Sequence, residues 1–221
     1  MKCKKFFAAA AACLMVAGFA ACGNEPTPVN PDEKVFQIGI VQLAEHPAMD
    51  EATRGFKEFL TEKLGDKVQF NVQNAQGEQT NCTTIVNQFV SSKVDLIMAN
   101  ATPSLQAAYN ATTEIPILGT AVTEYGVALG LKDFNGTVGG NVSGTSDLAP
   151  LTEQADMILE LLPETKTVGL LYCSAEPNSE YQVQVVEEYL TGKGITCTRY
   201  SFSDSNDVAA VTTVSYTHLT L

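Results

Sequence analysis

The sequence has few basic side chains. Its 221 residues include 13 lysines and arginines against 25 aspartates and glutamates, which gives a formal net charge of −12. Proteins that bind nucleic acids contact phosphate through clustered lysine and arginine, and here such residues cluster only within the first five positions. The composition therefore argues against a nucleic acid as partner.

The chain also lacks the common motifs of catalysis and metal binding. It contains no G-x-S-x-G nucleophile elbow, no P-loop and no G-x-G-x-x-G fingerprint. Its cysteines and histidines do not occur at the spacing of a zinc site. We therefore expect no metal, no cofactor and no enzymatic activity. Glu45 and His46 are adjacent, and three roles stay open: acid–base chemistry by Glu45 with His46, contact of their loop with a ligand, or capping of a helix by Glu45.

The cysteines do not form a disulfide framework. Of the six, an odd number (Cys82, Cys173 and Cys197) falls in the body of the chain. Buried free thiols are favoured there over a bridge between Cys173 and Cys197, which would require their strands to be neighbours.

Long apolar runs are absent except at the N-terminus. Lysines at positions 2, 4 and 5 precede an apolar run over residues 6–21, which is short for a bilayer-spanning helix of about 20 residues and is typical of a secretory signal. Ala20 and Ala21 precede Cys22, an arrangement that resembles a bacterial lipobox. It implies cleavage before Cys22 and lipidation of that residue, which would anchor an exported protein to the outer face of the cytoplasmic membrane. The alternative is an ordinary cleaved signal with a chance cysteine.

The body of the chain alternates strand and helix patterns. Apolar, β-branched runs predict strands, and segments with apolar residues at helical spacing lie between them. The alternation pauses at a glycine-rich stretch, 136–145, and then resumes. Repeated strand–helix units indicate an α/β fold with parallel sheets, and the pause indicates two such units. The predicted strands cover 35–43, 68–72, 94–98, 115–118, 167–172 and 195–202.

Two helix starts carry local signals. Thr102-Pro103 predicts a helix with Thr102 as N-cap and Pro103 as its first residue. Ser179-x-x-Gln182 is a capping box for a later helix. In parallel α/β sheets, ligands bind at the carboxyl ends of the strands, so the loops that precede these helices are expected to contact a ligand.

Five segments in order carry a family resemblance. They are GIVQLAEHPAMD from Gly39, QNAQG from Gln73, VDLIMANATP from Val94, GTAVT from Gly119 and VSGTSD from Val142. Over residues 35–213 the chain resembles the ABC-transporter substrate-binding lipoproteins that include tryptophan-transporter binding components. The resemblance implies two Rossmann-like lobes of a type I periplasmic binding protein, which close on a small molecule and deliver it to a permease and an ATPase.

The resemblance also implies a site. An amino acid, aromatic in some members of the family, would need donors for its carboxylate, such as Thr102, Ser104 and Thr120, and an acceptor for its ammonium, such as Asp147 or Glu45. Thr102 and Asp147 have the alternative role of helix caps. Glu124-Tyr125 replaces the family's usual Asp-Pro. The full set of expected ligand contacts is Glu45, His46, Thr102, Ser104, Thr120, Ala121, Ser146, Asp147, Glu176, Asn178 and Ser179.

The predicted organisation leaves the second lobe incomplete, because two such lobes need about 300 residues. We expect a monomer, with a sensory ligand-binding module for a membrane receptor and a surface hydrolase as alternative functions. The last eight residues break the pattern and are interpreted as a non-native tail. The predicted segments are a signal peptide (1–21), a tether (22–34), an N-terminal lobe (35–122), an inter-lobe crossover (123–148), a partial second lobe (149–213) and the tail (214–221).

Overall fold

The computed structural model describes residues 34–204 and 206–219. The predicted signal peptide, the lipidation site Cys22 and residues 22–33 of the tether lie outside the described residues. Among the residues that are described, no helix has both the length and the apolar character needed to cross a membrane.

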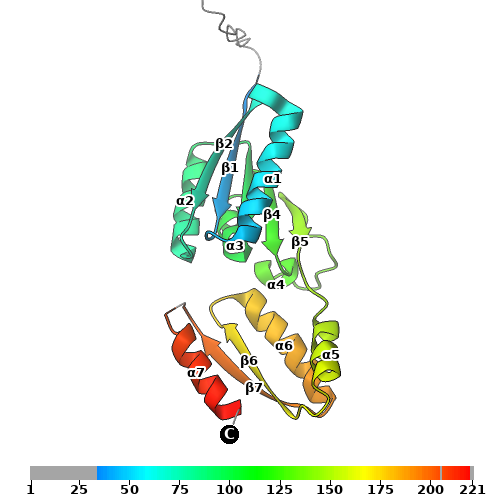
Figure 1. The fold of residues 1–221 in the computed structure, drawn as a ribbon. Helices are drawn as coiled ribbons and strands as arrows, with labels where there is room; N and C mark the ends of the chain where they lie inside the picture. Colours follow the sequence, from blue (N-terminus) through cyan, green and yellow to red (C-terminus); the bar gives the residue numbers. More distant parts are fainter. Residues whose placement is uncertain (1–33, 205, 220–221) are drawn as a thin grey trace, which may run out of the picture. The chain divides into compact units, whose positions relative to one another are not determined.

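The first lobe, residues 36–146, is built on a five-stranded parallel sheet in the order β2-β1-β3-β4-β5 (Figure 1). Its helices are α1 (Pro47–Leu64), α2 (Gln79–Ser91), α3 (Thr102–Ala111) and the short α4 (Tyr125–Leu129), with a 3-10 turn over Gly65–Lys67. Its strands are β1 (Phe36–Gln42), β2 (Val68–Asn74), β3 (Leu96–Asn100), β4 (Ile117–Val122) and β5 (Val142–Ser146).

The two faces of this sheet carry separate apolar cores. On one face α1 packs through Phe56 and Leu64 against a small cluster that includes Ile40. The other face, under α2 and α3, holds the larger cluster, in which the ring of Phe89 comes so close to β1 that a Cβ on Gly39 would lie 2.6 Å from it. The buried residues of α2 are Cys82, Ile85, Val86 and Phe89, which have the helical spacing by which helices were expected between the strands.

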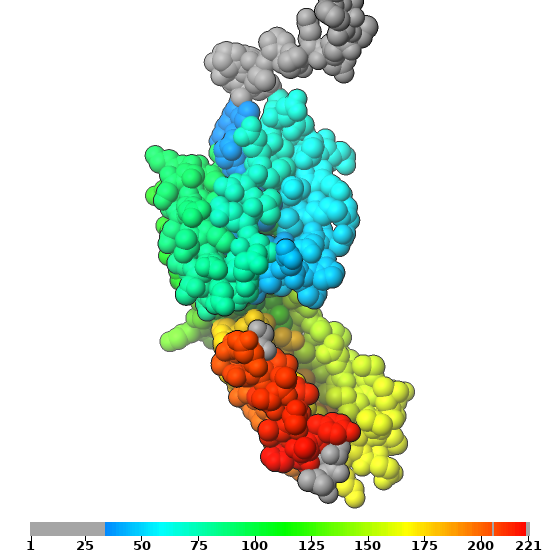
Figure 2. Space-filling model, turned by 60° about the vertical axis from the view of Figure 1, so that its left-hand side comes forward, coloured from blue at the N-terminus to red at the C-terminus, as the bar shows by residue number. Residues whose placement is uncertain are grey.

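The second lobe, residues 151–219, contains α5 (Leu151–Leu161), β6 (Thr167–Cys173), α6 (Pro177–Gly192), β7 (Thr196–Phe202) and α7 (Val208–Leu219). Strands β6 and β7 form a two-stranded parallel sheet. Helix α7 lies on the visible surface of this lobe in Figure 2. The α/β fold with parallel sheets is the one that the sequence predicted.

Helices α6 and α7 cover opposite faces of the β6–β7 sheet. Arg199 of β7 donates to Glu187 of α6 at 2.7 Å, so its face belongs to α6. The next residue, Tyr200, points the other way and its ring contacts His218 of α7, with 6.4 Å between ring centroids. A Cβ on Gly169 of β6 would likewise meet Leu219 of α7.

The register of β6 and β7 separates two cysteines that could have formed a bridge. Cys173 pairs with Phe202 at one end of the sheet, whereas Cys197 pairs with Val168 near the other. Both thiols are free, as is that of Cys82. The described thiols are free as expected, but only that of Cys82 is buried, and Cys173 and Cys197 are partly exposed.

The structure corrects three predicted helix starts. Helix α3 begins at Thr102 itself, with Ala101 as N-cap in an unusual conformation (φ 95°, ψ 159°), so Thr102 is not a cap. Helix α6 begins at Pro177 after Glu176, because proline is pre-organised for the first helical position. Ser179 is therefore inside the helix and forms no capping box. Asp147 caps nothing either, since α5 begins at Leu151 after Pro150.

Residues 123–148 contain more than a connection. Helix α4 and strand β5 both lie there, and β5 completes the edge of the first sheet. Of the five residues of β5 only Val142 is buried, so the apolar pattern of a buried strand is missing from the sequence.

Candidate functional site

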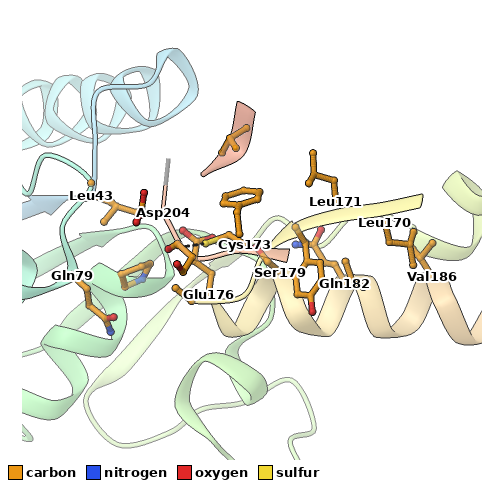
Figure 3. Close-up of a pocket in the computed structure, with 18 of the residues that line it drawn as sticks. Leu43, Gln79, Leu170, Leu171, Cys173, Glu176, Ser179, Gln182, Val186 and Asp204 are labelled. Carbon is orange, nitrogen blue, oxygen red and sulfur yellow. Dashed lines mark hydrogen bonds between the residues drawn. The ribbon is translucent and has the colours of Figure 1, made fainter. Parts of the chain in front are cut away.

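A cavity of about 1000 Å³ is lined from both lobes. The first lobe contributes Leu43 after β1, residues 76–79 between β2 and α2, and Pro103 at the start of α3. The second lobe contributes β6, the turn into α6 and residues 202–204 after β7 (Figure 3). Most of these segments follow the carboxyl end of a parallel strand, which is where α/β proteins bind ligands.

The charged side chains of the lining are all acidic. Glu78, Glu176 and Asp204 face the cavity, and the lining includes no lysine, arginine or histidine. Glu78 and Glu176 precede α2 and α6 as N-cap residues, yet neither side chain bonds to the backbone of its own helix. Ser179 donates to a carboxylate oxygen of Glu176 at 3.3 Å. The lining is therefore suited to a positively charged group rather than to a free anion.

Apolar side chains form a wall of the same cavity. It is formed by Leu170 and Tyr172 of β6 with Val183 and Val186 of α6, whereas Phe202 of β7 lines the cavity from the opposite face of the sheet. In Figure 3, Glu176, Ser179, Gln182 and Val186 follow one another along α6, from the polar part of the lining to the apolar part. The cavity can thus receive a molecule with a polar, cationic end and an apolar body.

The arginine of β7 is already paired with acidic side chains. Arg199 donates to Glu180 and Glu187 of α6, and its guanidinium lies 6.0 Å from the centroid of the Tyr172 ring. These two carboxylates neutralise its charge beside the cavity wall. A ligand carboxylate would therefore depend on backbone N–H groups at helix N-termini, where the helix dipole favours negative charge.

Of the predicted site residues, Glu176 and Ser179 line the large cavity. Asn178 lies between them in sequence, and its Oδ1 atom is buried without a hydrogen-bond partner in the described part of the chain.

Glu45 and His46 lie elsewhere. Glu45 lines a separate cavity of about 460 Å³ beside α1, together with Arg54 and Lys57. The N-cap of α1 is His46, whose Nδ1 accepts from the backbone N–H of Ala48 at 3.2 Å. The cap of α1 is therefore His46, and the expectation that Glu45 caps this helix was wrong.

Thr102 and Ser104 are core residues. Thr102 is 2% exposed and Ser104 is fully buried. The hydroxyl of Ser104 lies 3.6 Å from the Sγ atom of Cys82, where burial raises the pKa of the thiol. This pair links α3 to α2 under the sheet and does not line any of the three cavities described here.

The remaining predicted residues lie at the ends of β4 and β5. Thr120 lines a cavity of about 410 Å³ on the α1 side of the sheet. Ala121 has a positive φ of 51°. Ser146 donates to the backbone oxygen of Thr123 at 2.6 Å, and Asp147 is exposed. None of the four lines the large cavity.

Sequence reasoning missed much of the lining, including residues 169–173 of β6 and Gln182, Val183 and Val186 of α6. It also missed two segments that follow strands, residues 76–79 after β2 and residues 203–204 after β7. The signal was available, because both segments stand at the carboxyl end of a predicted parallel strand.

No metal centre is evident. Among the described residues, no group of three or more histidine, cysteine, aspartate or glutamate side chains could hold a metal ion.

Parallel sheets in two lobes, with a cavity lined from the strand ends of both, define a ligand-binding protein of the periplasmic type. The chain belongs to the ABC transporter substrate-binding protein family, whose model matches residues 37–218. The predicted family membership is thereby confirmed.

Individual relatives agree with this assignment. A tyrosine-binding protein of Clostridioides difficile is 41% identical over 179 residues, which is 80% of this chain and 52% of that protein. The chain therefore spans about half the length of the curated relative that it matches.

Two solved structures also share the fold. An ABC domain from Streptococcus pneumoniae in complex with L-Trp has a TM-score of 0.77 and 32% identity, and the match covers 83% of this chain and 63% of that one. A ligand-free, open substrate-binding protein with adhesive properties from Clostridium difficile has a TM-score of 0.58 and 39% identity, with coverage of 81% and 62%.

Proposed function

We propose that this chain captures an amino acid, with an aromatic side chain as the favoured kind, for import by an ABC transporter. The observation that carries the proposal is the large cavity, with three carboxylates, no basic side chain and an apolar wall. The relative that is named for tyrosine and the structure that contains L-Trp support the choice of ligand. The role is one of binding without catalysis.

The cavity lining fits the three parts of such a ligand. Glu78, Glu176 and Asp204 supply acceptors for the ammonium, and charge-assisted hydrogen bonds of this kind are among the strong ones. Backbone N–H groups in the first turns of α2 and α6 supply donors for the carboxylate. The apolar wall of Leu170, Tyr172 and Val186 receives the side chain. The ammonium acceptors proposed here replace Asp147 and Glu45 of the sequence-based expectation.

The proposal includes the wider setting of the protein. A permease and an ATPase would accept the ligand, and a lipid on Cys22 would hold the exported protein at the membrane as a monomer. Labelling of cells with a clickable fatty acid tests the anchor: the chain should carry the label, and Cys22→Ser should not. Label retained by Cys22→Ser would remove the anchor from the proposal.

Calorimetry tests the ligand. L-tyrosine, L-tryptophan and L-phenylalanine should bind, whereas 3-(4-hydroxyphenyl)propionate, which lacks the ammonium, should bind at least about tenfold more weakly, because hydrogen bonds to charged groups contribute about 1.5–3 kcal/mol each. Glu176→Gln should weaken L-tyrosine binding. The matched control is Glu160→Gln, an exposed position on α5 outside the lining. Absence of binding by every proteinogenic amino acid would remove the amino-acid assignment.

A further inference from the structure

The chain passes from the first lobe to the second through residues 147–150, which contain neither helix nor strand. In the described part of the chain this is the single connection between the two sheets. Strands β4 and β5 change register immediately before it: Gly119 pairs with Gly144, and the next pair is Val122 with Ser146. One extra residue on β4 is therefore accommodated as a bulge at the exit from the sheet.

Tyr125 fills the space beside this bulge. Its side chain is 6% exposed, and its hydroxyl donates to the backbone oxygen of Thr145 at 3.2 Å. A Cβ on Gly119 would lie 2.4 Å from the Tyr125 oxygen, and one on Gly144 would lie 2.1 Å from it. The tyrosine fits only because both facing residues are glycines.

Tyr125 is itself held firmly on the first lobe. The Glu124 carboxylate accepts from the backbone N–H groups of Gly126 (3.1 Å) and Val127 (2.5 Å) and so caps α4. Gln106 of α3 donates to the backbone oxygen of Ala128 at 2.8 Å. Glu124-Tyr125 stands where the family resemblance implies Asp-Pro. Glu124 caps α4 as an aspartate would, and Tyr125 has a hydroxyl that a proline would lack.

After Thr145, two more residues are hydrogen-bonded to the end of β4. Ser146 donates to the Thr123 oxygen at 2.6 Å, and the Asp147 N–H donates to the Val122 oxygen at 3.1 Å. The Leu148 N–H reaches only the Ser146 side chain, at 3.3 Å. The part of the exit that is hydrogen-bonded to β4 therefore ends at Asp147, and residues 148–150 connect it to α5 without a described hydrogen bond to β4.

We propose that Tyr125 is a positioning residue for ligand capture, because its hydroxyl fixes the point at which the chain leaves β5 and confines movement between the lobes to residues 148–150. The inference rests on the proposed function, in which both lobes contact one ligand. A looser exit would leave more relative orientations of the lobes to be ordered on binding, which lowers affinity without removing any ligand contact.

The experiment compares Tyr125→Phe with Tyr189→Phe. Tyr189 is the matched control, because its hydroxyl also donates a hydrogen bond, to Asp156 at 2.7 Å, but within the second lobe. Hydrogen exchange of the unliganded chains reports the exit directly. In Tyr125→Phe the Asp147 amide should exchange about fivefold faster, which corresponds to the loss of one hydrogen bond of typical strength. In Tyr189→Phe it should exchange at the wild-type rate.

Calorimetry with L-tyrosine supplies the second readout. Tyr125→Phe should weaken binding about fivefold, whereas Tyr189→Phe should bind within twofold of wild type at a similar loss of thermal stability. Unchanged exchange at Asp147, or equal losses of affinity in the two variants, would overturn the inference and leave Tyr125 a core residue only. If wild type binds no amino acid while Tyr125→Phe still accelerates exchange at Asp147, the proposed function fails and the positioning of the exit stands.

Discussion

The hydroxyl of Tyr125 occupies the place that a side chain on Gly144 would need: a Cβ built on Gly144 would lie 2.1 Å from the Tyr125 oxygen and 2.2 Å from the backbone oxygen of Gly119. Because one of these neighbours is backbone, the clash cannot be relieved by a side-chain rotation alone. With Tyr125 in this place, the backbone at the exit from the first sheet leaves no room for a side chain at position 119 or 144.

Gly144→Ala should accordingly destabilise the protein. We expect the free energy of unfolding to fall by about 1–3 kcal/mol, as for other insertions into packed sites. Urea unfolding followed by circular dichroism measures the change. Gly55→Ala is the control, because Gly55 lies inside α1 with nothing within 4 Å of an added Cβ. There the substitution should raise the free energy of unfolding by about 0.5–1 kcal/mol, and a Gly144→Ala protein as stable as wild type would contradict the packing described.

Alkaline pH should destabilise the wild-type chain through Tyr125. Burial, and secondarily the nearby Asp147 carboxylate, raises the pKa of Tyr125 to about 12, against about 10 in the unfolded chain. Above pH 10 the unfolded state therefore releases a proton that the folded state retains. The stabilisation is complete below pH 10 and is lost as the pH rises toward 12, at no more than about 1.4 kcal/mol for each pH unit.

The measurement is urea unfolding at pH 9, 10 and 11 of wild type and Tyr125→Phe. The difference in free energy of unfolding between the two should change over this range, because phenylalanine does not titrate. A difference that stays constant with pH would show that Tyr125 ionises equally in both states.

Ala101→Gly should stabilise the protein despite the greater flexibility of glycine. Ala101 has φ 95° and ψ 159°, a region that essentially only glycine occupies, and holding another residue there costs about 1–3 kcal/mol. After the entropic cost of glycine, about 0.5–1 kcal/mol, we expect a net gain of about 1 kcal/mol in urea unfolding. The contrasting variant is Ala107→Gly in the interior of α3, which should lose about 1 kcal/mol or more.

The described cysteines should differ in reactivity. Cys173 lines the large cavity and is partly exposed, whereas Cys82 is fully buried and its burial raises the pKa of the thiol. Iodoacetamide, which attacks thiolates, should modify Cys173 in the native chain and Cys82 only after unfolding, as read by peptide mass spectrometry. Saturating L-tyrosine should slow modification of Cys173. Equal rates at Cys173 with and without ligand would place the ligand outside this cavity.

Much of the fold could be predicted because apolar periodicity reflects burial directly. The face of α2 from Cys82 to Phe89 is an example, since its spacing is that of a buried helical stripe. Strand β5 could not be predicted in this way, because an exposed edge strand needs no apolar alternation. The start of α3 depends on the backbone conformation of Ala101, which is held by the surrounding structure and not by its own preference.

The site was less predictable than the fold. The strand-end rule selects loops correctly, but it cannot say which loops share one cavity. Glu176 and Asp204 lie on the same lining because β6 and β7 are neighbours in register, whereas Glu45 follows β1 and points to a different cavity. Which loops line one cavity is decided by the pairing of strands, and this pairing joins residues that are far apart in the sequence.

The placement of α6 and α7 on opposite faces of the β6–β7 sheet has a topological consequence. Connections between parallel strands are right-handed in about 98% of cases. A right-handed path from β6 over α6 leads to β7, so a right-handed path from β7 over α7 leads back across the sheet toward the free edge of β6. Any further parallel strand reached through α7 would thus pair beside Leu170 and Tyr172, and would share in shaping the apolar end of the large cavity.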